Sequence, residues 1–492
     1  MFSLIRMTSS NGESLATGDL VHQSGSSVKD EVGAECGVHG SWSWDGSTFI
    51  LKTDQYGYLP YYYHHDPVSG ELVVSDSPQE VASSLGHCRF DSRAIGFFAR
   101  SGFMLGDSTL YEGVRRASAN STLQWSAGVL HVTSGEVGPA TDQPRSVEEA
   151  LDGWIERFRV AMKRRVPTDD SIVMPLSAGR DSRMMLLELN RLDSIPRELV
   201  TIGSRANDDV RIARLIADRM NIPFRLISPT RLGWVDIEKH RHELCGFEAI
   251  EHSWLIPLWQ DLSRNGSGWF DGLGCGAVIR NSVNDEFALD LLRSKRDSDW
   301  ARLFFTRTAA PSEDWIDRIT QCSPVPIASH GEVVDFMQEE LDHHRDRPNP
   351  ITSFTFHNWG RRSIALNPFG ICRRTTSIGV PFMDRDLVEW SLSIPAEWCF
   401  DHDIQTRACH RLYPGFADVP FTLGGKSNRN PRHRMTRLLS YLQRKRFFRT
   451  EAACFRQLHD QVVDNSRANP ASFRAVTLMA HLTLVDKTVA SA

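Results

Sequence analysis

The sequence predicts two domains, a smaller, mostly β domain followed by a larger α/β domain with a parallel sheet. Before residue 134, short apolar runs alternate with turn residues, which is typical of β domains. Over 172–227, runs of strand length alternate with helical patterns, which predicts parallel strands joined by right-handed crossovers. Between these patterns lies a segment rich in Gly, Pro and small polar residues. We therefore expect domains at 1–133 and 146–492, joined by a linker at 134–145.

Composition excludes several classes of protein. The 492 residues are 41% hydrophobic and 24% charged, as in globular proteins and unlike disordered or collagen-like chains. A net charge of −5 argues against nucleic acid as a partner. The nine cysteines are odd in number and include no Cys-x-x-Cys pair, which argues against a disulfide scaffold or a zinc ribbon. No signal peptide or membrane-spanning run is evident, so we expect a cytoplasmic protein without a membrane partner.

The expected elements of both domains follow from local patterns. In the first domain, five apolar runs have the length of strands: 49–53, 61–63, 71–75, 121–125 and 128–132. In the second domain, the expected order is helix 146–164, strand 172–176, helix 183–189, strand 199–202, helix 208–221 and strand 224–227. The helix at 208–221 is predicted from apolar residues at 213, 216, 217 and 220, which share one helical face.

The segment Ser177–Ser182 reads SAGRDS and joins the first strand of the α/β unit to a helix. It therefore lies at the carboxyl end of a parallel strand, where such sheets bind ligands. It has neither the Gly-Lys-Ser/Thr ending of a Walker A loop nor a Gly-x-Ser-x-Gly elbow. Small residues let backbone N–H groups approach an anion, and the hydroxyls of Ser177 and Ser182 can donate to phosphate. Asp181 would repel phosphate unless Mg²⁺ lies between them. The alternative is a simple turn with an Asp or Ser as helix cap.

This loop resembles the S-G-G-x-D-S loop of the PP-loop ATP pyrophosphatases, and the chain as a whole resembles the asparagine synthetase-like family. The segment 200–203, followed by Asp208 and Asp209, is similar to the family's second strand and acidic helix. The segment 380–395 closely resembles the family's V-P-F-L-D-x-x-L-V-E stretch. In the first domain, 53–77 resembles the R-D-x-x-G-x-x-P-L-Y-Y…F-A-S-E pattern of the family's amidotransferase domain.

The resemblance implies an α/β PP-loop domain of the adenine nucleotide α-hydrolase-like type, preceded by an Ntn-amidotransferase-like domain. It implies that ATP and Mg²⁺ are bound, that a carboxylate is adenylated, and that an amine attacks the acyl-adenylate to give an amide, AMP and pyrophosphate. The substrates would be a carboxylate and an amine, with a peptide and its macrocyclisation in natural-product biosynthesis as one form. The residues carried over are Ser177, Gly179, Asp181 and Ser182 for phosphate, Asp181 also for the metal, Leu176 and Ile202 flanking adenine, Gly272 and Gly274 near the ribose and α-phosphate, and Lys426 stabilising developing charge.

The amino terminus departs from the family. Asparagine synthetases begin Met-Cys-Gly and use that cysteine to hydrolyse glutamine, whereas this chain begins Met1-Phe2-Ser3. Cys36 is followed by a similar motif but is internal, and a strand or core cysteine is the expected role for it. We therefore expect no glutaminase activity. Lasso-peptide cyclases and β-lactam synthetases, which belong to the same group, have lost it too.

A second departure concerns acidic residues around the nucleotide. The family's S-G-E-G-A-D-E loop corresponds here to 271–277, with Leu273 at the acid/base position and Gly276 at the metal-binding aspartate. A third acidic position reads Ser377. Asp271, or Asp285 with Glu286, are the acids that would have to substitute. A leucine cannot transfer a proton.

Two alternatives to an amide ligase therefore stay open. One is a degenerate family member that binds a nucleotide or a partner without catalysis, which the residues Leu273 and Gly276 favour. The other is an ammonia-dependent asparagine synthetase, since loss of the terminal cysteine removes glutamine as a nitrogen source but not free ammonia.

Overall fold

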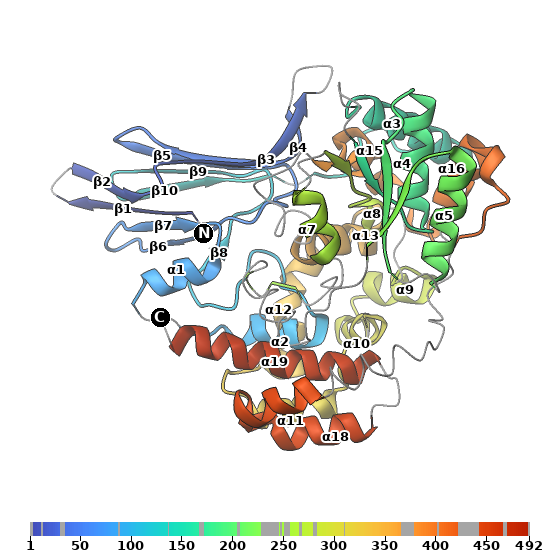
Figure 1. Cartoon of the computed structure of the whole chain (residues 1–492). Helices are drawn as coiled ribbons and strands as arrows, with labels where there is room; N and C mark the ends of the chain where they lie inside the picture. The colour runs from blue at the N-terminus through green and yellow to red at the C-terminus, as the bar shows by residue number, and fades with distance from the viewer. Residues whose placement is uncertain are drawn as a thin grey trace.

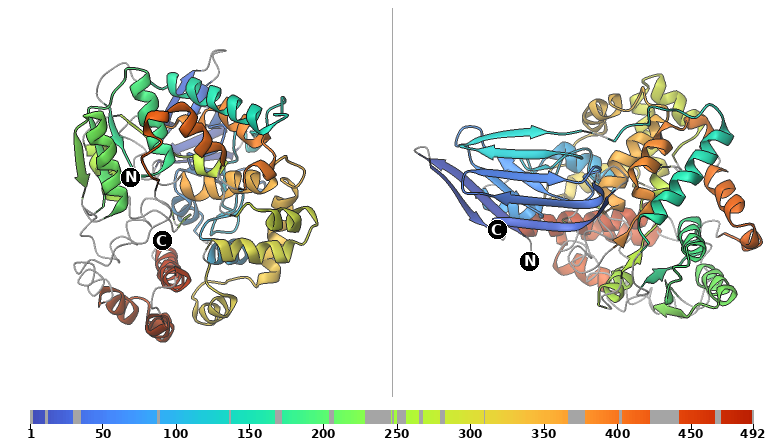
Figure 2. Two further views of the ribbon diagram at one scale, coloured as in Figure 1. Left: turned by 90° about the vertical axis from the view of Figure 1, so that its right-hand side faces the viewer. Right: turned by 90° about the horizontal axis from the view of Figure 1, so that it is seen from above.

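The computed structural model describes residues 3–10, 13–29, 35–86, 89–135, 137–166, 172–203, 207–227, 246, 248–249, 256–264, 268–278, 283–308, 310–365, 378–400, 403–421, 442–465 and 470–490. Two layers of strands form one side of the molecule, and helices around a smaller sheet form the other (Figure 1). The same division is visible from above in Figure 2. Among the described helices, none is both long and apolar enough to cross a membrane.

The N-terminal part consists of two five-stranded antiparallel sheets. Their orders are β2-β1-β7-β6-β8 and β10-β9-β5-β4-β3. The strands are β1 (Leu4–Ser10), β2 (Glu13–Gly18), β3 (Val21–Lys29), β4 (Glu35–Trp44), β5 (Thr48–Thr53), β6 (Tyr62–His65), β7 (Leu72–Ser75), β8 (Arg115–Arg116), β9 (Thr122–Ser126) and β10 (Val129–Thr133). Alternate residues such as Ile5, Leu72, Leu51 and Trp125 point between the sheets and are fully buried, as period-two side-chain alternation requires.

The α/β part contains a three-stranded and a two-stranded parallel sheet, five strands in all. They are β11 (Val173–Pro175), β12 (Glu198–Ile202), β13 (Phe224–Ile227), β14 (Trp269–Phe270) and β15 (Ile378–Gly379). β12 pairs with β11 and with β13, and β14 pairs with β15. The Val173 amide donates to the Gly268 carbonyl at 3.2 Å, which places β14 on the other side of β11. The chain thus leaves β11 towards β12 on one side and returns at β14 on the other, which is a topological switch point.

Helices cover this sheet and extend around it. Those of the α/β unit are α3 (Val147–Lys163), α4 (Arg180–Arg191), α5 (Asp208–Met220), α7 (Ile256–Arg264), α8 (Cys275–Val278), α15 (Arg385–Ser393) and α16 (Asp403–Leu412). The others are α1 (Pro78–Ser84), α2 (Ser92–Ser101), α9 (Glu286–Arg293), α10 (Asp297–Arg307), α11 (Glu313–Cys322), α12 (His330–Asp342), α13 (Pro350–Thr355), the π-helix η2 (Phe356–Ile364), α18 (Arg456–Asn465) and α19 (Pro470–Ala490). Short 3₁₀ turns are η3 (Pro381–Met383), η4 (Ala396–Trp398), η5 (Pro414–Phe416) and η6 (Ala453–Phe455).

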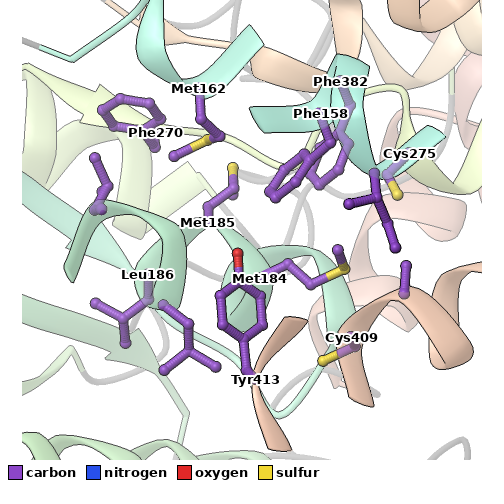
Figure 3. Close-up of a cluster of buried hydrophobic side chains, with 14 of the residues drawn as sticks. Phe158, Met162, Met184, Met185, Leu186, Phe270, Cys275, Phe382, Cys409 and Tyr413 are labelled. Atoms are coloured by element: carbon purple, nitrogen blue, oxygen red, sulfur yellow. The ribbon is translucent and has the colours of Figure 1, made fainter. Parts of the chain in front are cut away.

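A hydrophobic cluster fills the space between α3, α4 and α16 and packs against the strands that form the switch point. Figure 3 shows Phe158, Met162, Met185, Phe382 and Tyr413 converging from separate segments. The apolar positions of α3 and α4 recur at helical spacing, so each helix presents one face to this cluster. The start of α4, which carries Asp181, is therefore held by a packed core.

The expected strands and helices of 146–227 are confirmed within one to three residues, and so is the mostly β character of the first part. One expectation was wrong: α4 begins at Arg180, so Asp181 and Ser182 lie in the first turn of the helix and not in the loop before it. The extended backbone of Gly179 ends the loop one residue earlier. Strands β1 to β4 were not predicted, because small and polar residues in 4–44 obscure their alternation.

Cys36 lies within strand β4, opposite Val28 of strand β3. This confirms the strand assignment. The segment 134–145, which we predicted to be a linker, contains no helix or strand in its described residues. It is nevertheless packed against the protein, since Val137 is buried and the Ala140 amide donates to the Glu389 carbonyl.

Candidate functional site

The candidate site lies where β11 and β14 end side by side. The loop Ser177–Gly179 follows β11 and leads into α4, and Asp271–Gly274 follows β14 and leads into α8. Both segments therefore sit at the carboxyl edge of the sheet, on the two sides of the switch point. The sequence placed only the first of these strands, and the hydrogen bond from Val173 to Gly268 brings the second to it.

Side chains and backbone close the loop after β11 into a compact turn. The Ser177 amide donates to Ser182 Oγ at 3.1 Å, and the Gly179 amide donates to Ser177 Oγ at 3.1 Å. The Ala178 amide donates to Asp209 Oδ1 at 3.1 Å, from the first turn of α5. All three amides that we predicted for phosphate thus have partners inside the protein. A phosphate group would have to take these amides over. Rotation of the two serine side chains would free the Ser177 and Gly179 amides, whereas the Ala178 amide is held by Asp209.

Asp181 lies between two other polar groups in the first turn of α4. Its Oδ1 accepts a hydrogen bond from the Gln405 amide of α16. On its other side it lies against Gly272, where an added Cβ would come within 2.8 Å of Asp181 Cβ. Burial, opposed by the Leu273 amide and assisted by the nearby Asp181 carboxylate, raises the pKa of the Asp271 carboxyl to about 6. The two carboxylates therefore face a shared region of the site.

Gln405 is a site residue that the sequence analysis missed. Its side chain is only 1% exposed, and Nε2 donates both to Asp181 and to Cys275 Sγ, the latter at 3.1 Å. It ties together the starts of α4 and α8. A lone glutamine in a late helix carries no motif, so no sequence signal identifies it. Its neighbour Thr406 accepts from Arg180 Nε at 2.7 Å and fixes the direction of that side chain.

Leu176 and Ile202, predicted to flank adenine, lie at the ends of neighbouring strands. Both side chains are buried, and they belong to different hydrophobic clusters on the two faces of the sheet. The Leu176 carbonyl accepts from Thr201 Oγ1 at 2.6 Å. Contact of these two residues with adenine stays a prediction that rests on the resemblance.

The glycines that follow β14 occupy different environments, so a side chain would have a different effect at each. At Gly274, with φ of +93°, an added Cβ would lie 2.1 Å from Met383 Sδ, so no other residue fits. Gly272 lets the loop approach Asp181 closely. Gly276 is exposed, and nothing described lies within 4 Å of an added Cβ. Leu273 is 4% exposed and belongs to the core between the two parts of the molecule.

Of the acids proposed as substitutes, Asp271 is the one that the structure brings to the loop. Asp285 instead caps α9 through the Ala288 amide and forms an ion pair with Arg307. Asp384, in the segment 380–395 that resembles the family, is buried and paired with Arg164 and Arg165, which directly follow α3, so it is a structural link.

Two further predicted positions cannot be placed. Lys426 and Ser377 lie outside the described residues. Within the part of the chain that is described, no group of three or more His, Cys, Asp or Glu side chains converges as a complete metal site. Asp181 and Asp271 would therefore hold a divalent cation only together with ligands from the nucleotide or from water, which is the usual manner of Mg²⁺.

Comparisons with known proteins give little further information. The chain matches no protein-family model. No curated protein matches it significantly. Among solved structures, matches include the allosteric regulatory enzyme of purine biosynthesis, at 8% identity and a TM-score of 0.15, covering 48% of this chain and 56% of that one.

Another structural match is glutamine phosphoribosylpyrophosphate amidotransferase from B. subtilis complexed with ADP and GMP. It has 9% identity and a TM-score of 0.16, and the alignment covers 61% of each chain. This chain thus matches less than two thirds of the length of either structure. At such TM-scores neither likeness carries an argument about this protein.

Proposed function

We propose that this protein is an ATP-dependent, AMP-forming amide ligase of the asparagine synthetase-like type. The observation that carries the proposal is the meeting of Asp181 and Asp271 at the carboxyl ends of adjacent parallel strands, next to a loop of serines and glycine. A carboxylate that raises the pKa of a second one marks a natural place for a cation bound with a phosphate ligand, as Asp181 does for Asp271. The resemblance of the loop and of 380–395 supplies the reaction class.

In this proposal each part of the site has a defined task. The hydroxyls of Ser177 and Ser182 and the Gly179 amide contact phosphate oxygens, and the start of α4 contributes its partial positive charge. Asp181 and Asp271 hold Mg²⁺, and Gln405 keeps Asp181 in place. When bound, Mg²⁺ would offset the negative charge of the phosphates and of the two carboxylates.

The proposed reaction balances without an oxidant or reductant. A substrate carboxylate oxygen attacks the α-phosphorus of ATP, and the bond to pyrophosphate breaks. The amine nitrogen then attacks the acyl carbon, AMP leaves with the oxygen, and the nitrogen gives up its proton. Residue 273 cannot accept that proton, because it is a leucine buried in the core. The acceptor is therefore another group, and Lys426 remains the proposed residue for stabilising developing charge.

We also propose that the two N-terminal sheets are an Ntn-amidotransferase-like unit without glutaminase activity. The support is the pair of stacked five-stranded antiparallel sheets and the position of Cys36 inside strand β4, away from any chain terminus. Nitrogen would then come from an amine substrate directly.

A second function is favoured by a specific observation. Two positions that are acidic in the family loop are here a buried leucine, Leu273, and an exposed glycine, Gly276, whereas the sequence of the predicted phosphate loop is retained. A protein that binds a nucleotide and catalyses nothing would have this combination. Gly276→Asp distinguishes the two: the open space at 276 accommodates the new carboxylate, and a large gain in Mg-ATP affinity would indicate a decayed site.

Calorimetric titration of Mg-ATP tests the proposed site. We expect saturable binding to the wild type and a loss of about tenfold or more in affinity for Asp181→Asn and for Asp271→Asn. Asp218→Asn, an exposed acid on α5, is the matched control and should bind as the wild type does. Equal affinity in all four proteins would contradict a metal-nucleotide site at this edge.

Product analysis tests the reaction class. With ATP, a set of carboxylates and peptides, and amines, the ligase should release AMP and pyrophosphate. Release of ADP would remove the class. Turnover of aspartate with ammonia to asparagine would instead support the ammonia-dependent alternative. Nucleotide binding with no product from any substrate would favour the non-catalytic function.

A further inference from the structure

A cavity of about 260 Å³ lies at the junction of the N-terminal sheets and the helical part, formed by residues that the proposed nucleotide site does not use. One wall comes from 106–119 and from the start of the linker, and the other comes from α12 and the π-helix η2. Its volume suits a molecule smaller than a drug-sized ligand. π-helical segments are rare and frequently occur at functional sites.

The first unusual group in this cavity is His357 of η2. Its side chain is only 7% exposed, and its ring stacks on His344 and packs edge-on against Phe356. Among the described residues, no group forms a hydrogen bond with either ring nitrogen. Burial, and to a lesser extent repulsion from His344, lowers the pKa of His357 to about 3. The ring is therefore neutral at pH 7, and one of its nitrogens is an acceptor. The acceptor nitrogen of this ring is therefore available to a small molecule in the cavity that His357 lines.

The second group is Glu340 of α12. Its Oε1 accepts from Asn358 Nδ2 at 2.6 Å and lies 3.4 Å from His344 Nε2. Its Oε2 accepts nothing in the described structure and lies towards Gly106 in the cavity wall, 3.2 Å from where a Cβ would be. Burial raises the pKa of Glu340, but the contacts with His344 and Asn358 outweigh burial and bring the pKa to about 2. This side chain is therefore an ionised carboxylate with one free oxygen.

The remaining charges of the cavity cancel each other. Arg361 pairs with Asp107 at 2.7 Å and donates to the carbonyls of Ala117 and Gly57. No lysine or arginine of the described chain forms an ion pair with Glu340. Arg361 offsets part of the Glu340 charge without contacting it. The cavity thus presents one carboxylate oxygen that accepts no hydrogen bond from the described residues and one neutral imidazole acceptor, with the exposed His343 at its rim. A ligand that matches both groups carries a positive charge and several N–H donors.

We propose that this junction cavity binds a small protonated primary amine, whose ammonium group donates hydrogen bonds to Glu340 Oε2 and to a ring nitrogen of His357. The ammonium group supplies three donors, and both Glu340 Oε2 and the unprotonated ring nitrogen of His357 accept. A divalent metal ion is a poorer match, since the described residues offer no set of three ligands. An anion is repelled by Glu340. Because the walls belong to both parts of the molecule, the bound amine would also hold the two parts together.

Calorimetry with n-butylamine, putrescine and the neutral n-butanol tests the proposal on the full chain. At least one amine should bind saturably, and n-butanol should not bind. Glu340→Gln keeps an acceptor for Asn358 but removes the charge, so it should weaken amine binding by about tenfold or more. Glu339→Gln, an exposed neighbour on the same helix, should bind as the wild type does.

His357→Phe is the second variant, because it preserves the ring packing and removes the nitrogens. This variant should also lower the affinity for the amine, by about threefold to tenfold. Circular dichroism and the thermal midpoint establish that each variant is folded. The proposal is overturned if neither amine binds the wild type, if n-butanol binds as well as n-butylamine, or if both folded variants retain wild-type affinity. None of these outcomes depends on whether the chain binds ATP.

Discussion

Two aspartates that follow strands, Asp54 after β5 and Asp181 after β11, have opposite environments. Asp54 is 1% exposed, and its carboxylate accepts the amides of Tyr56, Tyr58 and Leu59 at 3.0–3.1 Å. Asp181 is partly exposed and faces another carboxylate. The first charge is held by backbone amides of its own loop and organises the fold, whereas the second accepts from Gln405, on a distant helix, and also lies near a second carboxylate. The two aspartates thus differ in whether a second negative charge lies beside them.

The largest expected effect separates these two aspartates by stability. Asp54→Ala leaves three buried amides without a partner and should lower the free energy of unfolding by about 3–5 kcal/mol. Asp181→Ala removes both the repulsion with Asp271 and the acceptor of Gln405 Nε2, two effects of opposite sign, and should change it by less than about 1 kcal/mol. Urea unfolding followed by tryptophan fluorescence measures both. Asp45→Ala is the control, because Asp45 accepts the Ser47 and Thr48 amides at the surface, where water replaces it. Similar losses of unfolding free energy in Asp54→Ala and Asp181→Ala would contradict the proposed difference between the two aspartates.

Two glycines of the loop after β14 test how closely that loop packs on Asp181. Gly272→Ala places a Cβ 2.8 Å from Asp181 Cβ and should cost about 1–3 kcal/mol while it pushes the aspartate away from Gln405. Gly276→Ala meets nothing described and should be neutral or slightly stabilising. Thermal unfolding midpoints compare the two variants. Equal midpoints would mean that the loop after β14 does not press on Asp181.

The pH dependence of stability reports the raised pKa of Asp271 beside Asp181. The folded-state pKa of Asp271 is about 6, above its ordinary 3.8, so the folded protein keeps a proton that the unfolded chain has lost. Stability from this group is full below about pH 4 and is lost as pH rises through 6. Asp271→Asn should remove that loss, which we expect to be about 1–2 kcal/mol after allowance for solvent screening. The quantity to measure is the wild-type minus variant stability at pH 4.5 and at pH 7.5. A constant difference would rule out the raised pKa.

The smallest expected effect concerns the loop itself. Asp209→Ala removes the acceptor of the Ala178 amide and should cost about 0.5–1.5 kcal/mol. Its neighbour Asp208 forms an exposed pair with Arg211, so Asp208→Ala should cost about 0.5 kcal/mol or less. Hydrogen exchange of 177–182 is the sharper measurement, and it should accelerate in the first variant alone.

Local sequence was sufficient for much of the α/β unit. The strands and helices of 172–227 were predictable because their apolar residues recur at the period of each element. The start of α4 at Arg180 was not, because a glycine cap carries no side-chain signal. Strands β1 to β4 were hidden by small polar residues and are held by pairing with partners up to about 70 residues away, as β1 is with β7.

By itself, therefore, the sequence determined the mostly β character of the first part, the strand-turn-helix unit around 177–182 and the acid within it, because these depend on neighbouring residues. Only the tertiary structure decided what surrounds that acid. Asp181 and Gln405 are 224 positions apart, and Asp271 arrives on a different strand. The same holds for Glu340 and His357, whose free acceptors meet a wall built by the N-terminal part. Burial and charge at these places arise from chain segments that meet only on folding, and local periodicity contains no record of such meetings.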